Sequence, residues 1–559
     1  MSVLYEDDEE QADVRVLDAA KALAFVGDLS MGQPTDHSLR TAWLAAQLAG
    51  EAGLGSVQCD VAKNVSLLRW SGCTANAPGF SELIGDDIAG REAMLARRPG
   101  SPVAAVVARD AGESIRRLAH IHCEVSGEVA RMLTLDDDTE VALRHIFESY
   151  DGQGWPNHVA GDRVPPIVFA VSLAGDLEIL GRVYGLDPAL EMIAKDAQGR
   201  YPGELVELVA RRGRQWHEAL SHDVPSAYDD FLTTDKTLQL TSPELIADVI
   251  DLKLPWMTQY SRRVATAAAL ATRHLGLDVA AQRRVYRAGL IHGMGRASVP
   301  NSVWNTPGKL SASEWEKVRL VPYWTMRAGK NIGALMPEAE LASFAYERLD
   351  GSGYFRSLSG ATLPVEARVL AAAAAWIALQ SPRPWRSALS SVEAMARLGE
   401  EARAGRFDMD AVAALGLQDG DVLEGGSASG SSAGASVSSA FSSSVGSSIS
   451  PSTGALPNPS NGTWRGNRGG MSGTHAYGPG HRGSDSTAAS ASRTKPATLS
   501  ARETDVLRHI SQGASNKEVA RVLDISLSTV RTHVESTFRK LECSTRAAAT
   551  LKASAMGLL

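Results

Sequence analysis

The segment from Leu499 to Ala549 decides the fold of the C-terminal part of the chain and reads LSARETDVLRHISQGASNKEVARVLDISLSTVRTHVESTFRKLECSTRAAA. Ser500 and Glu503 have the spacing of a capping box, in which the serine hydroxyl accepts from a helix N–H and the glutamate accepts from the serine amide. Ser515 and Glu518 repeat this spacing. Two short helices are therefore predicted to begin at these serines.

A third helix is predicted after a turn at 524–526, and its residues divide into two faces. The apolar residues recur at spacings of four, four and three, which predicts a buried stripe; they are Val530, Val534, Phe538 and Leu541. The opposite face carries side chains of the kind that reach base edges and phosphates in the major groove; they are Thr529, Arg531, Thr532, Glu535 and Arg539. A fourth helix, at about 545–556, completes the predicted domain.

This segment resembles the DNA-binding domain of the bacterial LuxR/NarL/FixJ regulators. The resemblance implies a four-helix LuxR-type helix-turn-helix domain over 496–559 that binds double-stranded DNA, with Arg531 and Thr532 at base edges and Thr529 and Lys540 at phosphates. The other predicted DNA-binding residues are Lys517, Glu535 and Arg539, and Glu535 departs from the basic residue often seen there. The alternative is a small helical bundle used for protein contacts.

The distribution of charge supports local binding to DNA. The whole chain has a formal charge of −8, which argues against a protein that coats nucleic acid along its length. Residues 496–559 carry nine Lys and Arg against six Asp and Glu, a net charge of +3. The positive charge is therefore located where DNA binding needs it.

The composition also predicts a disordered linker and the cellular compartment of the protein. Residues 424–495 are rich in serine, glycine and alanine, which cannot bury enough apolar area to offset chain entropy, and this stretch is predicted to be disordered. The N-terminal tail, 1–13, is acidic, and the chain has no run of 18 apolar residues. A cytoplasmic protein without a membrane association is therefore predicted.

The remaining chain is predicted to be mostly α-helical, with apolar residues at helical spacing and few stretches that alternate as strands do. Asp151-Gly152 and Asp350-Gly351 begin two similar glycine-rich segments. We therefore predict two copies of one helical bundle, at 14–220 and at 240–417.

The second copy contains a longer match. Its defining stretches are Asp251-Leu252-Lys253, Ser261-Arg262-Arg263, Gly289-Leu290-Ile291-His292-Gly293, Pro300-Asn301-Ser302-Val303-Trp304 and Glu347-Arg348-Leu349-Asp350-Gly351-Ser352-Gly353-Tyr354. These resemble an HD-GYP domain, a member of the HD superfamily. The resemblance implies an enzyme domain that hydrolyses cyclic di-GMP, using a cluster of two or three metal ions held by histidine and aspartate side chains.

The resemblance also locates the metal-ligand positions, and only one of them carries a ligand here. The seven positions are Tyr260, His292, Gly293, Val321, Ala345, Tyr346 and Ala374. One imidazole cannot hold a metal cluster that generates a hydroxide nucleophile. The domain is therefore predicted to be degenerate, a pseudoenzyme with no metal and no other cofactor.

The first copy is more diverged. His37 stands at the first ligand position, but Arg69-Trp70 replaces the HD pair and puts a guanidinium where a cation would bind. A metal site formed by His120, His122 and His145 is disfavoured, because His120 and His122 lie two residues apart on a helix and point to different faces.

These observations predict a transcription regulator, active as a homodimer, whose helical bundles are sensory or oligomerisation modules for a nucleotide or protein effector. Two alternatives are kept. One is an active metal-dependent cyclic di-GMP phosphodiesterase with a DNA-binding tail. The other is a module that binds a nucleotide without cleaving it, with Arg262, Arg348 and Arg356 as candidate contacts.

Overall fold

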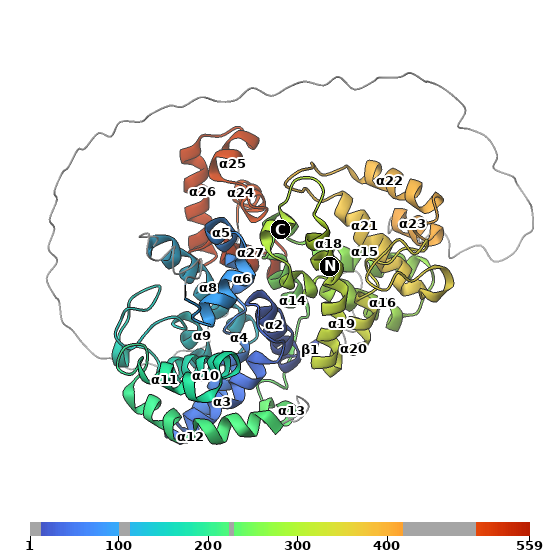
Figure 1. Ribbon diagram of the computed structural model, residues 1–559. Helices are drawn as coiled ribbons and strands as arrows, with labels where there is room; N and C mark the ends of the chain where they lie inside the picture. Colours follow the sequence, from blue (N-terminus) through green and yellow to red (C-terminus); the bar gives the residue numbers. More distant parts are fainter. Residues whose placement is uncertain (1–12, 100–111, 223–227, 418–498) are drawn as a thin grey trace, which may run out of the picture. The chain divides into compact units, whose positions relative to one another are not determined.

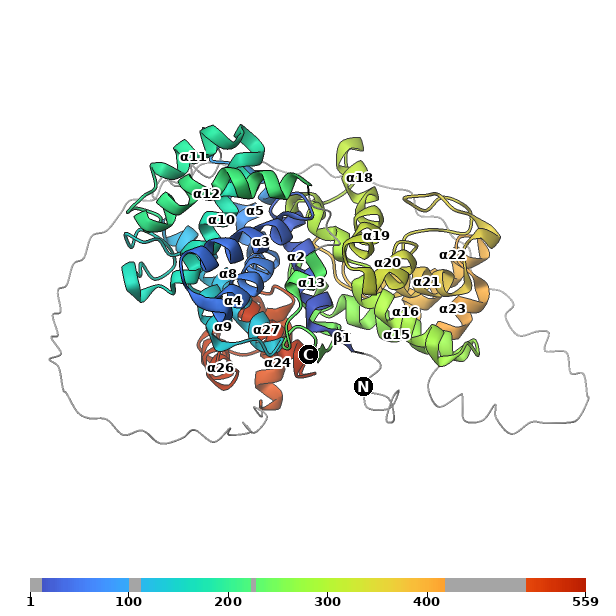
Figure 2. The same ribbon diagram turned by 90° about the horizontal axis from the view of Figure 1, so that it is seen from below.

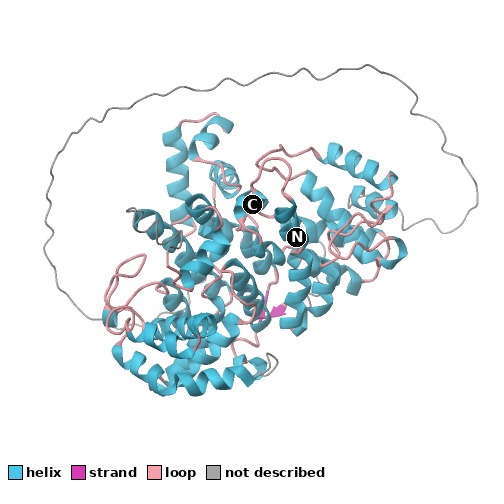
Figure 3. Cartoon of the chain, in the orientation of Figure 1, coloured by secondary structure: helices cyan, strands magenta, loops and turns pink. Residues whose placement is uncertain are grey.

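The computed structural model describes residues 13–99, 112–222, 228–417 and 499–559, and the regular elements of these residues are helices apart from one short sheet (Figure 3). The prediction of a mostly α-helical fold is confirmed. The predicted linker, 424–495, lies outside the described residues, and so does the acidic tail apart from Asp13.

The first repeat, defined as α2 to α12, forms one helical bundle (Figure 1). Its helices are α2 (Val16–Ser30), α3 (His37–Glu51), α4 (Gly55–Leu68), α5 (Cys73–Ile84), α6 (Asp87–Leu95), α8 (Gly112–Met132), α9 (Asp137–Arg144), α10 (Pro166–Tyr184), α11 (Leu186–Ala194) and α12 (Gly203–His222). The 3-10 helix η1 (Gly161–Arg163) precedes α10, and α13 (Tyr228–Leu232) follows the repeat.

The second repeat, defined as α14 to α23, is a similar bundle. Its α-helices are α14 (Glu244–Asp251), α15 (Tyr260–His274), α16 (Val279–Ile291), α17 (Asn301–Trp304), α18 (Ala312–Arg319), α19 (Val321–Asn331), α20 (Met336–Ala342), α21 (Val365–Leu379), α22 (Ser391–Arg403) and α23 (Met409–Gly416). Short 3-10 helices connect them: η3 (Pro255–Met257), η4 (Met294–Ser298), η5 (Gly333–Leu335) and η6 (Gly360–Thr362).

The helix α2 joins the two repeats into one core, and the two repeats together are called here the body. All 15 of its residues are buried, and it contacts α4 and α5 of the first repeat and α14 and η4 of the second. In both Figure 1 and Figure 2, α2 lies between α10–α12 on one side and α19–α23 on the other. Apolar residues of both repeats belong to one continuous hydrophobic cluster.

A two-stranded antiparallel sheet was not predicted. Its strands are β1 (Val14–Arg15) and β2 (Leu240–Thr241), and Val14 is opposite Thr241. Strands of two residues are too short to show an alternating pattern in the sequence. The sheet places the residues before α2 next to those before α14.

Two equivalent helix starts relate the repeats. Ser38, at the start of α3, donates its amide and hydroxyl to Asp28, with N···O and O···O distances of 3.1 and 2.6 Å. Ser261, at the start of α15, donates in the same way to Asp251, and both distances are 2.7 Å. In each repeat the carboxylate lies ten residues before the serine.

The glycine-rich segments fold into the same loop. Gly152 and Gly351 have φ angles of 77° and 78°, the left-handed conformation that the Asp-Gly sequences favour. The buried Glu347 accepts from the amides of Arg356 and Leu358 at 2.8 and 3.1 Å. Glu148 likewise accepts from amides nine and eleven residues further along. One buried carboxylate therefore organises each loop.

The head, defined as residues 499–559, consists of α24 (Ala501–Ser511), α25 (Asn516–Val522), α26 (Leu527–Lys540) and α27 (Arg546–Ala555). Both predicted capping boxes are present, at Ser500 and Ser515. The predicted stripe lies in a separate hydrophobic cluster, where Val530, Val534 and Leu541 are buried and Phe538 is partly buried.

Candidate functional site

A cavity of about 550 Å³ opens in the second repeat and is called here the aromatic cavity. Seven aromatic side chains line it: Trp256, Tyr260, Trp304, Trp315, Tyr346, Tyr354 and Trp385. Four cationic side chains also line it: Arg296, Lys309, Arg348 and Arg383. Among the described residues that line this cavity there is no aspartate or glutamate. The cavity therefore combines flat apolar surfaces with an excess of positive charge.

The fold brings several of the predicted ligand positions together at this cavity. Tyr260, Ala345, Tyr346 and Ala374 line it, and the Tyr260 hydroxyl donates to the Ala374 carbonyl oxygen at 3.0 Å. The His292 ring lies between two tyrosines, with centroid distances of 5.6 Å to Tyr260 and 6.2 Å to Tyr346. Burial raises the pKa of Tyr260 to about 12, so its hydroxyl keeps its proton.

The other two positions lie beside the cavity rather than on its wall. Val321, at the start of α19, is buried in a small hydrophobic cluster with Val299, Val303 and Val318. Gly293 is buried next to Arg296, and a Cβ atom placed on it would lie 2.6 Å from the Arg296 Nη1 atom. A side chain at this position and the guanidinium therefore compete for the same space.

Arg296, which the sequence did not single out, is the central cation of the site. It is 3% exposed, and its Nη2 donates to Nε2 of His292 at 2.6 Å and to the Tyr346 hydroxyl at 3.3 Å. Its Nη1 lies 3.4 Å from Asp251 Oδ1, and its guanidinium carbon lies 4.7 Å from the Tyr260 ring centroid. The guanidinium is therefore fixed by contacts on several sides.

Burial sets the protonation of the two groups that hold Arg296. Burial and then the nearby Arg296 charge lower the pKa of His292 to about 3, so its ring is neutral. The His292 Nδ1–H donates to the Gly289 carbonyl oxygen at 2.5 Å, which leaves Nε2 as an acceptor. Burial raises the pKa of Asp251 to about 7, although Arg296 and Ser261 oppose that shift.

These side chains do not fit the metal cluster that the HD-GYP resemblance implies. A histidine binds a metal through an unprotonated ring nitrogen, and that nitrogen of His292 accepts from Arg296 instead. The guanidinium also repels a cation. Within the described ranges, no group of three or more His, Cys, Asp or Glu side chains is placed to hold a metal ion.

The first repeat holds Arg69 at the position that corresponds to His292. The Arg69 Nη2 contacts Nε2 of His37, and the His37 Nδ1 donates to Glu178 at 2.5 Å. His37 and Arg69 are both buried. Although burial opposes it, the contacts of Glu178 with His37 and Arg182 hold the pKa of this carboxyl at about 2.

The three histidines weighed as a metal site have separate partners. His122 is buried and its Nε2 donates to the Arg69 carbonyl oxygen at 2.6 Å. His120 bonds to Ser544, and His145 bonds to the Val141 carbonyl oxygen. The structure does not bring these histidines together.

Only one of the three arginines proposed as nucleotide contacts lines the aromatic cavity. Arg348 does so, with its guanidinium 4.3 Å from the Phe407 ring centroid. Arg262 forms two bonds of 2.7 Å with Asp248, and Arg356 donates to Ser343 at 3.0 Å. Sequence reasoning missed Arg383 and Lys309 as well, because they lie in irregular segments without a motif.

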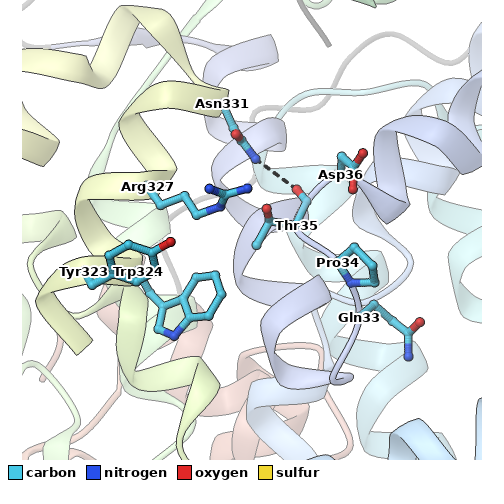
Figure 4. A pocket seen from close by; sticks show the side chains of 8 residues that line it. All are labelled: Gln33, Pro34, Thr35, Asp36, Tyr323, Trp324, Arg327 and Asn331. Atoms are coloured by element: carbon cyan, nitrogen blue, oxygen red, sulfur yellow. Dashed lines mark hydrogen bonds between the residues drawn. The ribbon is translucent and has the colours of Figure 1, made fainter. Parts of the chain in front are cut away.

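A second cavity, of about 380 Å³, lies between the loop before α3 and the helix α19 (Figure 4). Asn331 Nδ2 donates to the Thr35 carbonyl oxygen at 3.1 Å across it, and Figure 4 shows the Arg327 guanidinium pointing toward Thr35. Asp36 and Arg327 both line this cavity. Its charges are therefore balanced, unlike those of the aromatic cavity.

The head exposes all the residues predicted to contact DNA: Lys517, Thr529, Arg531, Thr532, Glu535, Arg539 and Lys540. Six of them lie on α26 and Lys517 lies on α25. The Lys540 Nζ lies 2.7 Å from Glu503, so this ammonium also stabilises the first capping box. Their contacts with DNA stay predictions.

Family models match two parts of the chain. The model described as an HD domain matches residues 244–411, and the model described as bacterial regulatory proteins of the luxR family matches residues 497–553. The first match covers the aromatic cavity, and the second covers most of the head. In the described part of the chain, no helix is both long enough and apolar enough to cross a membrane.

Curated relatives match the same parts. The 3'3'-cGAMP-specific phosphodiesterase 3 of Vibrio cholerae is 23% identical over 404 residues, 67% of this chain and 88% of that protein. A cyclic di-GMP phosphodiesterase response regulator of Xanthomonas campestris is 33% identical over 173 residues, 30% of this chain and 45% of that protein. The monoamine regulon transcriptional regulator of Klebsiella aerogenes is 53% identical over 47 residues, 8% of this chain and 21% of that protein.

A solved structure shares the fold of the body. The crystal structure of a cyclic GMP-AMP-specific phosphodiesterase of Vibrio cholerae matches with a TM-score of 0.53 and 21% identity, over 73% of this chain and 99% of that chain. This likeness shows the fold alone.

The comparisons contradict the prediction that the protein is not an enzyme. Relatives that match its HD domain are named phosphodiesterases for cyclic dinucleotides. The prediction considered only seven metal-ligand positions, whereas activity depends on the whole set of side chains around the phosphodiester. What the matches do establish is the architecture: the chain joins an HD domain related to cyclic-dinucleotide phosphodiesterases to a LuxR-type DNA-binding domain.

Proposed function

We propose that this protein is a cytoplasmic transcription regulator in which a cyclic dinucleotide binds the aromatic cavity and changes the occupancy of the head on DNA. The observation that carries the proposal is the lining of the cavity, with seven aromatic rings and four cations but no carboxylate among its described residues. Its volume of about 550 Å³ is within the usual range of small-molecule sites.

The lining matches the two chemical parts of a cyclic dinucleotide. Its purine rings are planar and stack on aromatic side chains, and such stacking contributes about 1–3 kcal/mol per base. Its two phosphodiesters are anions that pair with guanidinium groups through parallel N–H···O bonds. A cavity with both features favours this ligand over an apolar molecule of the same size.

Arg383 supports the proposal through an unsatisfied donor. Its guanidinium carbon lies 4.5 Å from the Trp256 ring centroid, and its buried Nη1 has no hydrogen-bond partner within the described residues. A buried polar group without a partner costs free energy. A phosphate oxygen in the cavity would satisfy this donor.

On the DNA side, we propose that two heads of a homodimer bind two half-sites, with α26 in the major groove of each. Arg531 and Thr532 would read base edges, while Lys517, Thr529, Arg539 and Lys540 would contact phosphates. Glu535 would accept from a cytosine amino group if it reaches a base edge.

The proposal is tested by fluorescence anisotropy with a labelled duplex selected by the protein from random DNA. Cyclic di-GMP and 3'3'-cGAMP are titrated into the complex, and calorimetry measures their binding directly. We expect binding to the wild type and a loss of about 10-fold or more in Arg383→Ala, because a charge-assisted bond is removed. Arg263→Ala is the matched control, since Arg263 is exposed and outside the cavity lining. If neither dinucleotide binds the wild type, the proposal that a cyclic dinucleotide is the ligand of the aromatic cavity is refuted.

Hydrolysis of the bound dinucleotide is a second candidate function, favoured by the names of the relatives that match the HD domain. Chromatography of the same samples after incubation with Mn²⁺ detects the linear dinucleotide. Formation of that product by the wild type would make the protein a phosphodiesterase as well as a regulator.

A further inference from the structure

We propose that Arg296 takes the place of a metal ion and binds a phosphate of the ligand, so that the aromatic cavity binds a cyclic dinucleotide without any metal. This inference rests on the proposed function for the identity of the ligand. It goes beyond that function because it assigns the phosphate to one side chain and states the metal requirement.

The chain leaves space for the Arg296 guanidinium at Gly293. Gly293 follows His292, so it stands at the aspartate position of the HD pair, and a Cβ there would lie 2.6 Å from Nη1 and 2.8 Å from Cζ of Arg296. The absence of a side chain at Gly293 therefore gives Arg296 its place next to the histidine.

An arginine also contacts a histidine in the first repeat. There the guanidinium of Arg69 contacts Nε2 of His37, and a Cβ placed on Gly175 would collide with Arg69 Nη1. Arg69 stands at the position of the HD histidine, whereas Arg296 lies four residues after His292, so the two arginines come from different positions. In each repeat, an arginine contacts a histidine ring nitrogen that would bind a metal, and a glycine leaves room for the guanidinium.

Arg296 is preorganised at the wall of the aromatic cavity. Its Nη2 donates to His292 and to the Tyr346 hydroxyl, its Nη1 lies next to Asp251, and Tyr260 lies against its face. A guanidinium has five N–H donors in a fixed plane, so these contacts do not use all of them. Little rotamer entropy remains to be lost when a phosphate binds.

The charges around the cavity also favour an anionic ligand. The one carboxylate that pairs with Arg296 is Asp251, which also accepts both bonds from Ser261. Among described residues, the other three cations of the cavity have no carboxylate within ion-pair distance; they are Lys309, Arg348 and Arg383. The excess of positive charge on the lining therefore favours an anionic ligand.

The test measures binding of cyclic di-GMP and 3'3'-cGAMP to the full-length protein by calorimetry, once in EDTA and once in Mn²⁺. We expect wild-type affinities that agree within about twofold in the two buffers. Arg296→Ala should weaken binding about 10- to 100-fold, as expected for loss of a charged hydrogen-bonding partner. Arg296→Lys should recover part of the affinity, because it keeps the charge but loses the planar donor pair.

Two controls keep the test decisive. Arg263→Ala removes an exposed arginine of α15 that does not line the cavity, and it should bind as the wild type does. Thermal melting reports the folding of each variant. If Arg296→Ala does not fold, the wild-type comparison in EDTA and the Arg296→Lys variant decide the question.

The proposal is overturned if EDTA abolishes wild-type binding or if folded Arg296→Ala binds as tightly as the wild type. If the wild type binds neither dinucleotide, the proposed function fails and GMP becomes the probe in EDTA. Binding of GMP that is lost in Arg296→Ala would then support the role of Arg296 alone, and equal or absent binding in both proteins would refute it.

Discussion

At the scale of single residues, Arg531 is the sharpest test of the DNA-binding face, because it is exposed on α26 and its side chain has a planar pair of donors for guanine. Arg531→Ala is expected to lose about 1–3 kcal/mol of discrimination between the selected duplex and a scrambled one. Competition anisotropy measures that difference.

The control for this prediction is Arg508→Ala. Arg508 is an exposed arginine on α24, 3.6 Å from Asp505, so its loss removes the same charge from the head without touching α26. Equal discrimination by the wild type and Arg531→Ala would show that α26 is not the recognition helix.

The stability of the glycine-rich loop is expected to depend on Glu347. It is 1% exposed and accepts from two loop amides, so Glu347→Ala would leave two buried donors without a partner. We expect a loss of about 2–5 kcal/mol in the free energy of unfolding, measured by urea denaturation. Asp350→Ala, which changes a partly exposed turn carboxylate of the same loop, should cost less.

Residue identities predicted part of the candidate site. The resemblance located Tyr260, Tyr346 and Ala374 at one place, and the fold brings them to one cavity. Arg296 could not be predicted, because its role follows from the empty space at Gly293, which only packing shows. The role of Arg383 could not be predicted either, because this residue lies far from the motifs along the chain.

At the scale of elements, the start of α24 should make the stability of the head depend on pH. Although burial opposes it, bonds from Lys540, Ser500 and Ser536 lower the pKa of Glu503 from 4.5 to about 2. A carboxyl with a lowered pKa in the folded state stabilises the fold above its ordinary pKa, and that contribution is lost as the pH falls from about 4.5 to about 2.

The matching measurement compares the wild type with Glu503→Gln. The variant should lose about 1–3 kcal/mol of unfolding free energy at neutral pH, as charged hydrogen bonds are weakened. The difference between the two proteins should shrink as the pH falls below 4.5. A difference that is constant across this range would contradict the assignment.

Local sequence signals predicted the elements of the head better than those of the body. The capping boxes at Ser500 and Ser515 fix two helix starts through side chains three residues apart. The strands β1 and β2 are 225 residues apart at Arg15 and Leu240, and their pairing follows from tertiary contacts. No local pattern encodes such a pairing.

At the scale of the whole molecule, the continuous core of the body predicts that both repeats unfold together. Phe25, on α2, is 1% exposed, and Phe25→Ala should cost about 3–5 kcal/mol. Far-ultraviolet circular dichroism should show one transition for the body, shifted to lower temperature. Val57→Ala is the control, because Val57 is 67% exposed. Two separate body transitions would mean that the repeats are independent.

The small sheet also gives the molecule a mechanical property. The amides of Val16 and Leu17 donate to the carbonyl oxygens of Gln239 and Thr237, at 2.8 and 2.9 Å, next to the β1–β2 pair. A load applied to the chain at Val14 would pass through the β1–β2 pair and these bonds into the residues that precede the second repeat. Pulling on the N-terminal end would thus strain both repeats at once. The hydrogen bonds of the β1–β2 sheet would have to break before α2 could leave the core.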